Sequence, residues 1–185
     1  MNLVLFFAGL FSVALSAQEI FCEYAGRSNM KTITLSEAPN GADDRINEIL
    51  NVVGLSGNFN VKVANINNAA AMIYGSQRYV LFNPQFMQAV YKKAGTKWTT
   101  YSILAHEIGH HLNGHTIGSK KTLHECELEA DEFSGFVLGK LGASREEAML
   151  AIAISGANSP THTHPDKGTR MKAIAMGWNR ARTQP

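Results

Sequence analysis

Two histidines four residues apart, with a glutamate between them, are the feature that most constrains how this chain can fold. They are His106 and His110, and the glutamate is Glu107, in the stretch His-Glu-Ile-Gly-His. On an α-helix, residues four apart lie about 40° from each other around the axis, so both imidazoles point toward one place. Zinc binds neutral imidazole nitrogens, and Glu107, about 100° further round, can reach a water molecule there. The spacing therefore predicts a helix that carries two zinc ligands and a general base. The alternative is that the three residues share a solvated helix face by chance.

The residues around this motif predict a helix with a core side and a site side. Gly109 lowers helix propensity, which indicates that another segment approaches the backbone there. Apolar residues recur at helical spacing on the side away from the two histidines, namely Tyr101, Leu104, Ile108 and Leu112.

A catalytic zinc site needs a third protein ligand, and several residues downstream could supply it. His111 points about 100° away from His110, and the position six residues after His110, which one large class of zinc peptidases uses, is Thr116. Glu127 and Asp131 lie four residues apart, so they share a helix face. This pattern favours Glu127 as the third ligand, with Asp131 accepting the spare N–H of a ligand histidine. A solvated acidic helix start explains the same two residues equally well.

Three motifs in this order resemble those of the HtpX-like and CAAX-prenyl-protease type zinc peptidases, which are gluzincins with a glutamate as third ligand. The motifs are His-Glu-Ile-Gly-His-His with a further histidine at 115, Glu-Leu-Glu-Ala-Asp at 127–131, and His164-Pro165 followed by Arg170. The resemblance covers about residues 98–175. Many members of the family are integral membrane proteins. This chain has no spanning segment beyond its N-terminal run, so prenylated substrates are not implied.

The resemblance also implies roles for individual residues. It implies that Glu127 binds zinc and that Asp131 orients a ligand histidine. It further implies that His164 lies near the substrate carbonyl and could stabilise the oxyanion, with Arg170 as a structural partner in the site. His162, two residues before His164, is a rival for that position.

Strand patterns come early in the chain and helical patterns late, which predicts an α+β fold. We expect a zincin-like arrangement, in which a small N-terminal sheet precedes a helical region that carries the zinc motif and the third ligand on adjacent helices. The expected helices cover residues 42–55, 84–92, 98–113, 123–141, 144–156 and 166–182. The expected strands cover residues 58–66, 70–74 and 78–82, the last two forming a hairpin. Residues 78–82 are the candidate edge strand for pairing with an extended substrate, or else an ordinary core strand.

Residues 2–17 form an uncharged apolar run that ends in small side chains, which is typical of a cleaved export signal. At about sixteen residues the run is short for crossing a bilayer. We therefore expect a signal peptide at residues 1–17 and a single domain at residues 18–185. The protein would then be periplasmic or secreted, without a stable membrane span. An uncleaved anchor or a buried N-terminal helix is the alternative.

The two cysteines and the charge say less about function. After export, Cys22 and Cys126 could form a disulfide or remain free thiols, and their spacing leaves both possibilities open. A net charge of +2, without a basic run interleaved with aromatic residues, argues against a nucleic-acid partner.

Together these features predict a zinc-dependent endopeptidase that holds one Zn²⁺ per chain and acts on protein or peptide substrates. Glu107 would be the general base, and His164 would stabilise the developing charge. Two alternatives remain. Zinc could only join helices together, with a fourth ligand from His115, His124 or Cys126. The chain could also be a chaperone-like module with a vestigial site.

Overall fold

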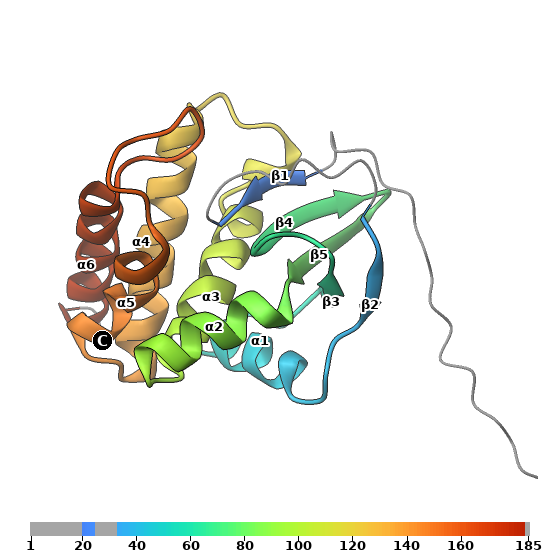
Figure 1. Ribbon diagram of the computed structural model, residues 1–185, viewed down its shortest axis with the longest axis horizontal. Coiled ribbons are helices and arrows are strands. Elements are labelled where there is room, and N and C mark those ends of the chain that lie inside the picture. The colour runs from blue at the N-terminus through green and yellow to red at the C-terminus, as the bar shows by residue number, and fades with distance from the viewer. Residues whose placement is uncertain (1–19, 25–32, 184–185) are drawn as a thin grey trace, which may run out of the picture.

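The computed structural model describes residues 20–24 and 33–183, and this part of the chain has an α+β fold (Figure 1). Its strands are β1 (Ile20–Glu23), β2 (Leu35–Glu37), β3 (Phe59–Ala64), β4 (Ala69–Tyr74) and β5 (Gln77–Phe82). Its α-helices are α1 (Ala42–Asn51), α2 (Pro84–Ala94), α3 (Trp98–Leu112), α4 (Leu123–Leu141), α5 (Arg145–Ser155) and α6 (Lys167–Thr183). A short 3₁₀ helix, η1 (His115–Ile117), joins α3 to α4. The expected signal at residues 1–17 lies outside the described residues.

The strands form one sheet in the order β1-β4-β5-β3-β2. Strands β4 and β5 form the expected hairpin, and β3 pairs in parallel with the other side of β5, with Phe59 opposite Arg78. Strand β5 therefore has neighbours on both sides. The expectation that residues 78–82 form a substrate-binding edge is wrong, because β3 pairs with the side of β5 that the hairpin leaves open. The strands β1 and β2, which cover the two edges, were not expected from the sequence.

Helix α3 lies between the sheet and helices α4, α5 and α6, as Figure 1 shows. It is buried from Tyr101 to His111 because β4, α4 and α5 all pack against it. The expectation of a helix with a core face therefore understates its burial. The prediction that Leu112 lies on the core side is wrong, since this residue lies at the end of the helix and is exposed.

Helices α4 and α6 pack unusually closely through two glycines. A Cβ atom at Gly135 would lie 1.9 Å from the carbonyl oxygen of Ile174, and one at Gly177 would lie 1.9 Å from that of Glu132. Only a residue without a side chain fits at these two crossing points. The close approach matters for the site, because α6 carries Arg170 and α4 carries Glu127 and Asp131.

The four helices expected after residue 98 are present, each ending within one residue of the expected position. Capping explains where two of these helices begin. Thr122 and Glu125 form a capping box at the start of α4, and Ser144 and Glu147 form another at the start of α5. The helix expected at 42–55 ends earlier, at Asn51. None of the helices in the described part of the chain combines the length and apolarity that a membrane crossing needs.

Candidate metal centre

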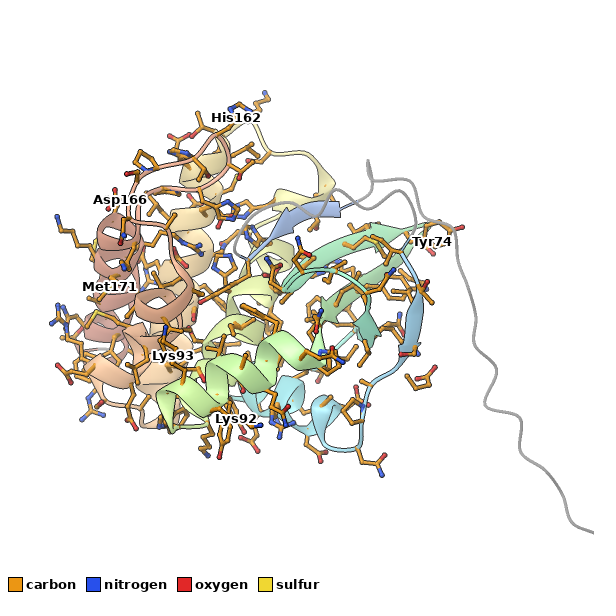
Figure 2. All side chains as sticks on the ribbon, in the orientation of Figure 1. Tyr74, Lys92, Lys93, His162, Asp166 and Met171 are labelled. Carbon is orange, nitrogen blue, oxygen red and sulfur yellow. The ribbon has the colours of Figure 1, made fainter. Side chains whose placement is uncertain are left out.

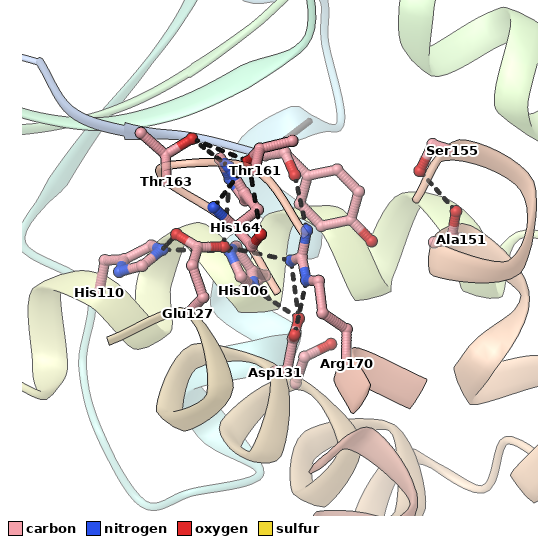
Figure 3. A network of polar contacts seen from close by, with 12 residues as sticks. His106, His110, Glu127, Asp131, Ala151, Ser155, Thr161, Thr163, His164 and Arg170 are labelled. Atoms are coloured by element: carbon pink, nitrogen blue, oxygen red, sulfur yellow. Dashed lines mark hydrogen bonds and ion pairs between the residues drawn. The ribbon is translucent and has the colours of Figure 1, made fainter. Parts of the chain in front are cut away.

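His106, His110 and Glu127 come together in the buried space between α3 and α4 (Figure 3). Their ligand atoms all lie within 4.8 Å of one another. The two Nε2 atoms are 3.0 Å apart, and each lies 3.4 Å from an oxygen of Glu127. All three side chains are buried, the histidines completely.

Gly109 allows the two helices to approach closely enough for this arrangement. A Cβ atom at Gly109 would lie 3.1 Å from the Cα of Ala130 and 3.2 Å from the ring of Phe133, both on α4. These distances are tighter than ordinary van der Waals contact. The expectation that another segment approaches the backbone at Gly109 is therefore confirmed, and the segment is the one that carries Glu127.

The three ligand atoms fit a tetrahedral metal ion. An ion with bonds of about 2.0–2.1 Å holds its ligand atoms roughly 3.3 Å apart, close to the separations of 3.0 and 3.4 Å among these residues. Two imidazole nitrogens and one carboxylate oxygen are also the donor set of many catalytic zinc sites. The centre can therefore hold a metal ion.

Asp131 fixes the orientation of His106. Its Oδ1 lies 2.9 Å from Nδ1 of His106, and because a carboxylate can only accept, Nδ1 carries the proton and Nε2 faces the centre. Burial alone would raise the pKa of Asp131, but the charges of Arg170 and His106 outweigh it and hold that pKa below its ordinary value. Asp131 therefore remains ionised as an acceptor.

Arg170 holds the carboxylates in place from α6. It donates to Asp131 from Nε at 2.7 Å and from Nη2 at 2.9 Å, and it donates from Nη1 to the carbonyl oxygen of Tyr24 at 2.9 Å. Its Nη2 also lies 3.3 Å from Glu127. Figure 3 shows the guanidinium beside both acidic side chains. Arg170 thus joins α6, α4 and the N-terminal strand around the centre.

The electrostatics of the centre favour a positive charge between the ligands. Burial alone would lower the pKa of His106, yet Asp131 and Glu127 raise it to about 9. Burial alone would raise the pKa of Glu127, but hydrogen bonds from His106 and His110 hold it well below its ordinary value. Burial lowers the pKa of His110 to about 4, which leaves its ring in the neutral form that binds metal. An ion at this point would meet an ionised carboxylate and a neutral imidazole.

Glu107 is the side chain whose position is hardest to explain without a ligand. Both of its carboxylate oxygens are buried, and neither makes a hydrogen bond to another described residue. Burial, together with the charge of Glu127, raises the pKa of Glu107 to about 8. The backbone of Ala71 on β4 lies close enough to oppose this shift, but it does not form a hydrogen bond of normal geometry with the carboxylate. Buried carboxylates without partners are rare and costly, so this group points to chemistry at the centre.

His164, and not His162, reaches the centre. Its Nε2 lies 3.3 Å from Oε2 of Glu127, whereas His162 is exposed at the outer end of the molecule (Figure 2). Hydrogen bonds between Thr161 and His164 hold the loop, including one from Thr161 N to the carbonyl oxygen of His164 at 2.8 Å and one from His164 N to Oγ1 of Thr161 at 2.9 Å. His124, at the start of α4, donates to the carbonyl oxygen of Thr161 and ties the loop to that helix. The loop therefore places one imidazole beside the ligand carboxylate.

The other downstream candidates lie elsewhere. His111 points away from the centre, as expected, with Nε2 2.9 Å from the carbonyl oxygen of Tyr79 and Nδ1 3.2 Å from Thr116. Cys126 is buried as a free thiol. The side chain of Cys22 lies outside the described residues.

Two further residues lie beside the centre, and only one of them was named from the sequence. The ring of Tyr24, the residue after β1, packs edge-on against the ring of His106 with centroids 5.0 Å apart. His115 lies behind His110, with its Nδ1 3.0 Å from Nδ1 of His110. No pattern marks Tyr24, since it meets His106 only in the folded chain. His115 was considered only as a possible fourth ligand of a structural zinc site, and it lies instead between His110 and Glu129.

Six of the residues named from the sequence therefore lie in one buried cluster: His106, His110, Glu127, Asp131, His164 and Arg170. Comparison of the chain with protein-family models, with curated proteins and with solved structures found no match. The residues of the centre themselves, rather than a relative, thus indicate its chemistry.

Proposed function

We propose that this protein is a zinc-dependent endopeptidase with a zincin-like fold. The observation that carries the proposal is the buried carboxylate of Glu107, which makes no hydrogen bond within the described part of the chain and lies beside the group formed by His106, His110 and Glu127. A metal centre that served structure alone would have no use for such a carboxylate. The resemblance of the three motifs to gluzincin peptidases supports the same function.

Bound zinc would supply Lewis acidity, polarising the carbonyl of the scissile bond and lowering the pKa of a water molecule. Glu107 accepts a proton from the attacking water and delivers it to the leaving amine. Its raised pKa suits this exchange, because a base works best when its pKa lies near the working pH. His164 donates an N–H to the oxygen that becomes negatively charged. Asp131 keeps His106 in the tautomer that leaves Nε2 toward the centre.

One observation favours a second candidate, a zinc ion that only holds α3 and α4 together. The three ligand side chains are almost fully buried, as they are in closed structural sites. Such a site needs four protein ligands, however, and the group found among the described residues has three. His115 faces away from the centre toward Glu129, so it does not complete the set.

The proposal is tested by the metal dependence of cleavage. The purified protein is incubated with casein in three states: as isolated, after treatment with a chelator, and after zinc is restored. We expect fragments in the first and third states and none in the second. Zinc binding without cleavage of casein or of any peptide in a mixed library would support the structural role instead.

We also propose export, with residues 1–17 as the signal peptide, on the strength of their uncharged run and small terminal residues. The mass of the exported protein should correspond to a chain that begins at Gln18. A mature protein that keeps residues 1–17 would instead support an N-terminal anchor.

A further inference from the structure

We propose that His115 is the positioning residue of the second metal ligand, His110, and that it connects this ligand to Glu129 at the protein surface. The proposal rests on the metal centre proposed above and assigns a function to a histidine outside the ligand set. It concerns the affinity and geometry of metal binding and makes no claim about the substrate.

The chain brings His115 back behind His110 by a tight turn after α3. Gly114 has a positive φ of 75°, which a residue with a side chain rarely adopts, and η1 starts at the next residue. His115 is completely buried, although it lies in a connection between two helices. Its ring meets that of His110 at 64°, with centroids 5.2 Å apart and the two Nδ1 atoms 3.0 Å apart.

The proton positions along this contact are set by what each group can do. A metal at Nε2 of His110 leaves the proton of that ring on Nδ1, which then must donate to Nδ1 of His115. His115 therefore accepts at Nδ1 and carries its own proton on Nε2. That nitrogen lies 3.0 Å from Oε2 of Glu129, a group that accepts. Each hydrogen bond in the series from His110 through His115 to Glu129 thus has one donor and one acceptor.

Lys121 is the last member of this hydrogen-bonded series and lies at the protein surface. Its ammonium group pairs with the other carboxylate oxygen of Glu129. One oxygen of Glu129 thus faces the cation of Lys121, while the other accepts from His115.

The two ligand histidines are consequently fixed by different groups. Asp131, buried and paired with Arg170, accepts directly from His106. His110 is fixed instead through the neutral ring of His115, whose partner Glu129 is partly exposed. Partners of this kind keep a ligand in one tautomer and orientation, and their loss typically weakens metal binding about 10–100-fold.

The alternative is that His115 only fills space in the turn, and two substitutions separate the possibilities. His115→Phe keeps a ring in the same place but removes both hydrogen bonds. His115→Gln replaces the ring by an amide that can still accept from His110 and donate to Glu129. His111→Phe is the matched control, since it changes an equally buried neighbouring histidine that faces Tyr79 instead of the centre.

The experiment measures the dissociation constant for zinc by competition with a chromophoric chelator, and the visible spectrum of the Co²⁺-loaded protein. We expect His115→Phe to weaken zinc binding about 10–100-fold and to shift the cobalt spectrum. His115→Gln should recover most of the affinity, and His111→Phe should match the wild type. Equal affinity in His115→Phe and the wild type would overturn the assignment of His115 while leaving the peptidase proposal intact. A wild type that binds no zinc would overturn the metal centre itself.

Glu129→Leu tests the same series of hydrogen bonds at a partly exposed position, where the substitution does not disturb the core. We expect a smaller loss of zinc affinity, several-fold, because His115 keeps its contact with His110. Unchanged affinity in both Glu129→Leu and His115→Phe would show that the hydrogen bonds from His110 to His115 and Glu129 have no part in metal binding.

Discussion

Arg170 and Asp131 form a two-point ion pair at the centre of the helical layer, and one oxygen of that pair also holds His106. Oδ1 of Asp131 lies 2.9 Å from both Nη2 of Arg170 and Nδ1 of His106, while Oδ2 takes the Nε–H of Arg170 at 2.7 Å. Both partners are almost fully buried. The packing of α6 against α4 and the orientation of a metal ligand therefore depend on the same carboxylate.

Removing the charge of Arg170 should destabilise the fold strongly. Arg170→Met keeps a side chain of similar length but leaves Asp131 buried without its cation, and breaking a buried pair in this way typically costs about 3–5 kcal/mol. Arg180→Met is the matched control, because Arg180 pairs with Glu132 between the same two helices at an exposed position. That change should cost no more than about 1 kcal/mol. Urea unfolding of both variants measures the difference, and equal losses would contradict the account.

The glycine crossing of α4 and α6 should tolerate no side chain. In Gly177→Ala the new methyl group would lie 1.9 Å from the carbonyl oxygen of Glu132, so the helices must separate. We expect a loss of about 1–3 kcal/mol or more in unfolding free energy, together with weaker zinc binding as Arg170 moves away from Asp131. Met176→Ala, at the exposed neighbouring position, should change stability by less than about 0.5 kcal/mol. A fully stable Gly177→Ala protein would show that the helices are not held this closely.

Tyr24 should contribute through its ring and not through its hydroxyl group. The hydroxyl is buried near Ser102 but makes no hydrogen bond of normal geometry to a described residue. Tyr24→Phe should therefore be neutral or stabilising, whereas Tyr24→Ala should cost about 3–5 kcal/mol because it leaves a cavity beside His106. Thermal unfolding of the two variants distinguishes these effects. A large loss in Tyr24→Phe would mean that the hydroxyl has a partner after all.

His111 should make the stability of the metal-free protein depend on pH. Burial lowers its pKa from 6.5 to about 4, although its contact with Tyr79 opposes the shift. Between pH 6.5 and 4 the unfolded chain binds a proton that the folded chain does not, so the contribution of this residue falls as the pH falls. The slope is up to about 1.4 kcal/mol per pH unit.

His111→Gln removes this titration. Urea unfolding in the presence of a chelator at pH 7, 5.5 and 4.5 should show the wild type losing its advantage over His111→Gln as the pH falls. A constant difference between the two proteins across this range would contradict a lowered pKa at His111.

The helices and the members of the site could be predicted because their signals are local. The capping boxes at Thr122 and Ser144 mark helix starts, and the four-residue spacings of His106 with His110 and of Glu127 with Asp131 place each pair on one face. These patterns need no knowledge of the rest of the chain.

The sheet edges and the surroundings of α3 could not be predicted, because they depend on contacts between distant segments. Strands β1 and β2 are short, and β1 is held in the sheet through its pairing with β4, nearly fifty residues away. Strand β5 is an interior strand because β3 pairs with it in parallel, and no local sequence pattern reveals that pairing. Tyr24 reaches His106 only through this sheet. Leu112 has the spacing of a core residue, yet the helix ends there and leaves it exposed.

The role of Glu107 as general base at a zinc centre is tested by measuring zinc content and casein cleavage together for the wild type and Glu107→Gln. Gln keeps the shape of the side chain but cannot take the proton, so we predict one zinc per chain in both proteins and at least a 100-fold loss of cleavage in the variant. Glu146→Gln, at an exposed position on α5, should behave as the wild type. If Glu107→Gln cleaves casein as fast as the wild type, Glu107 is not the general base, and the proposed mechanism is contradicted.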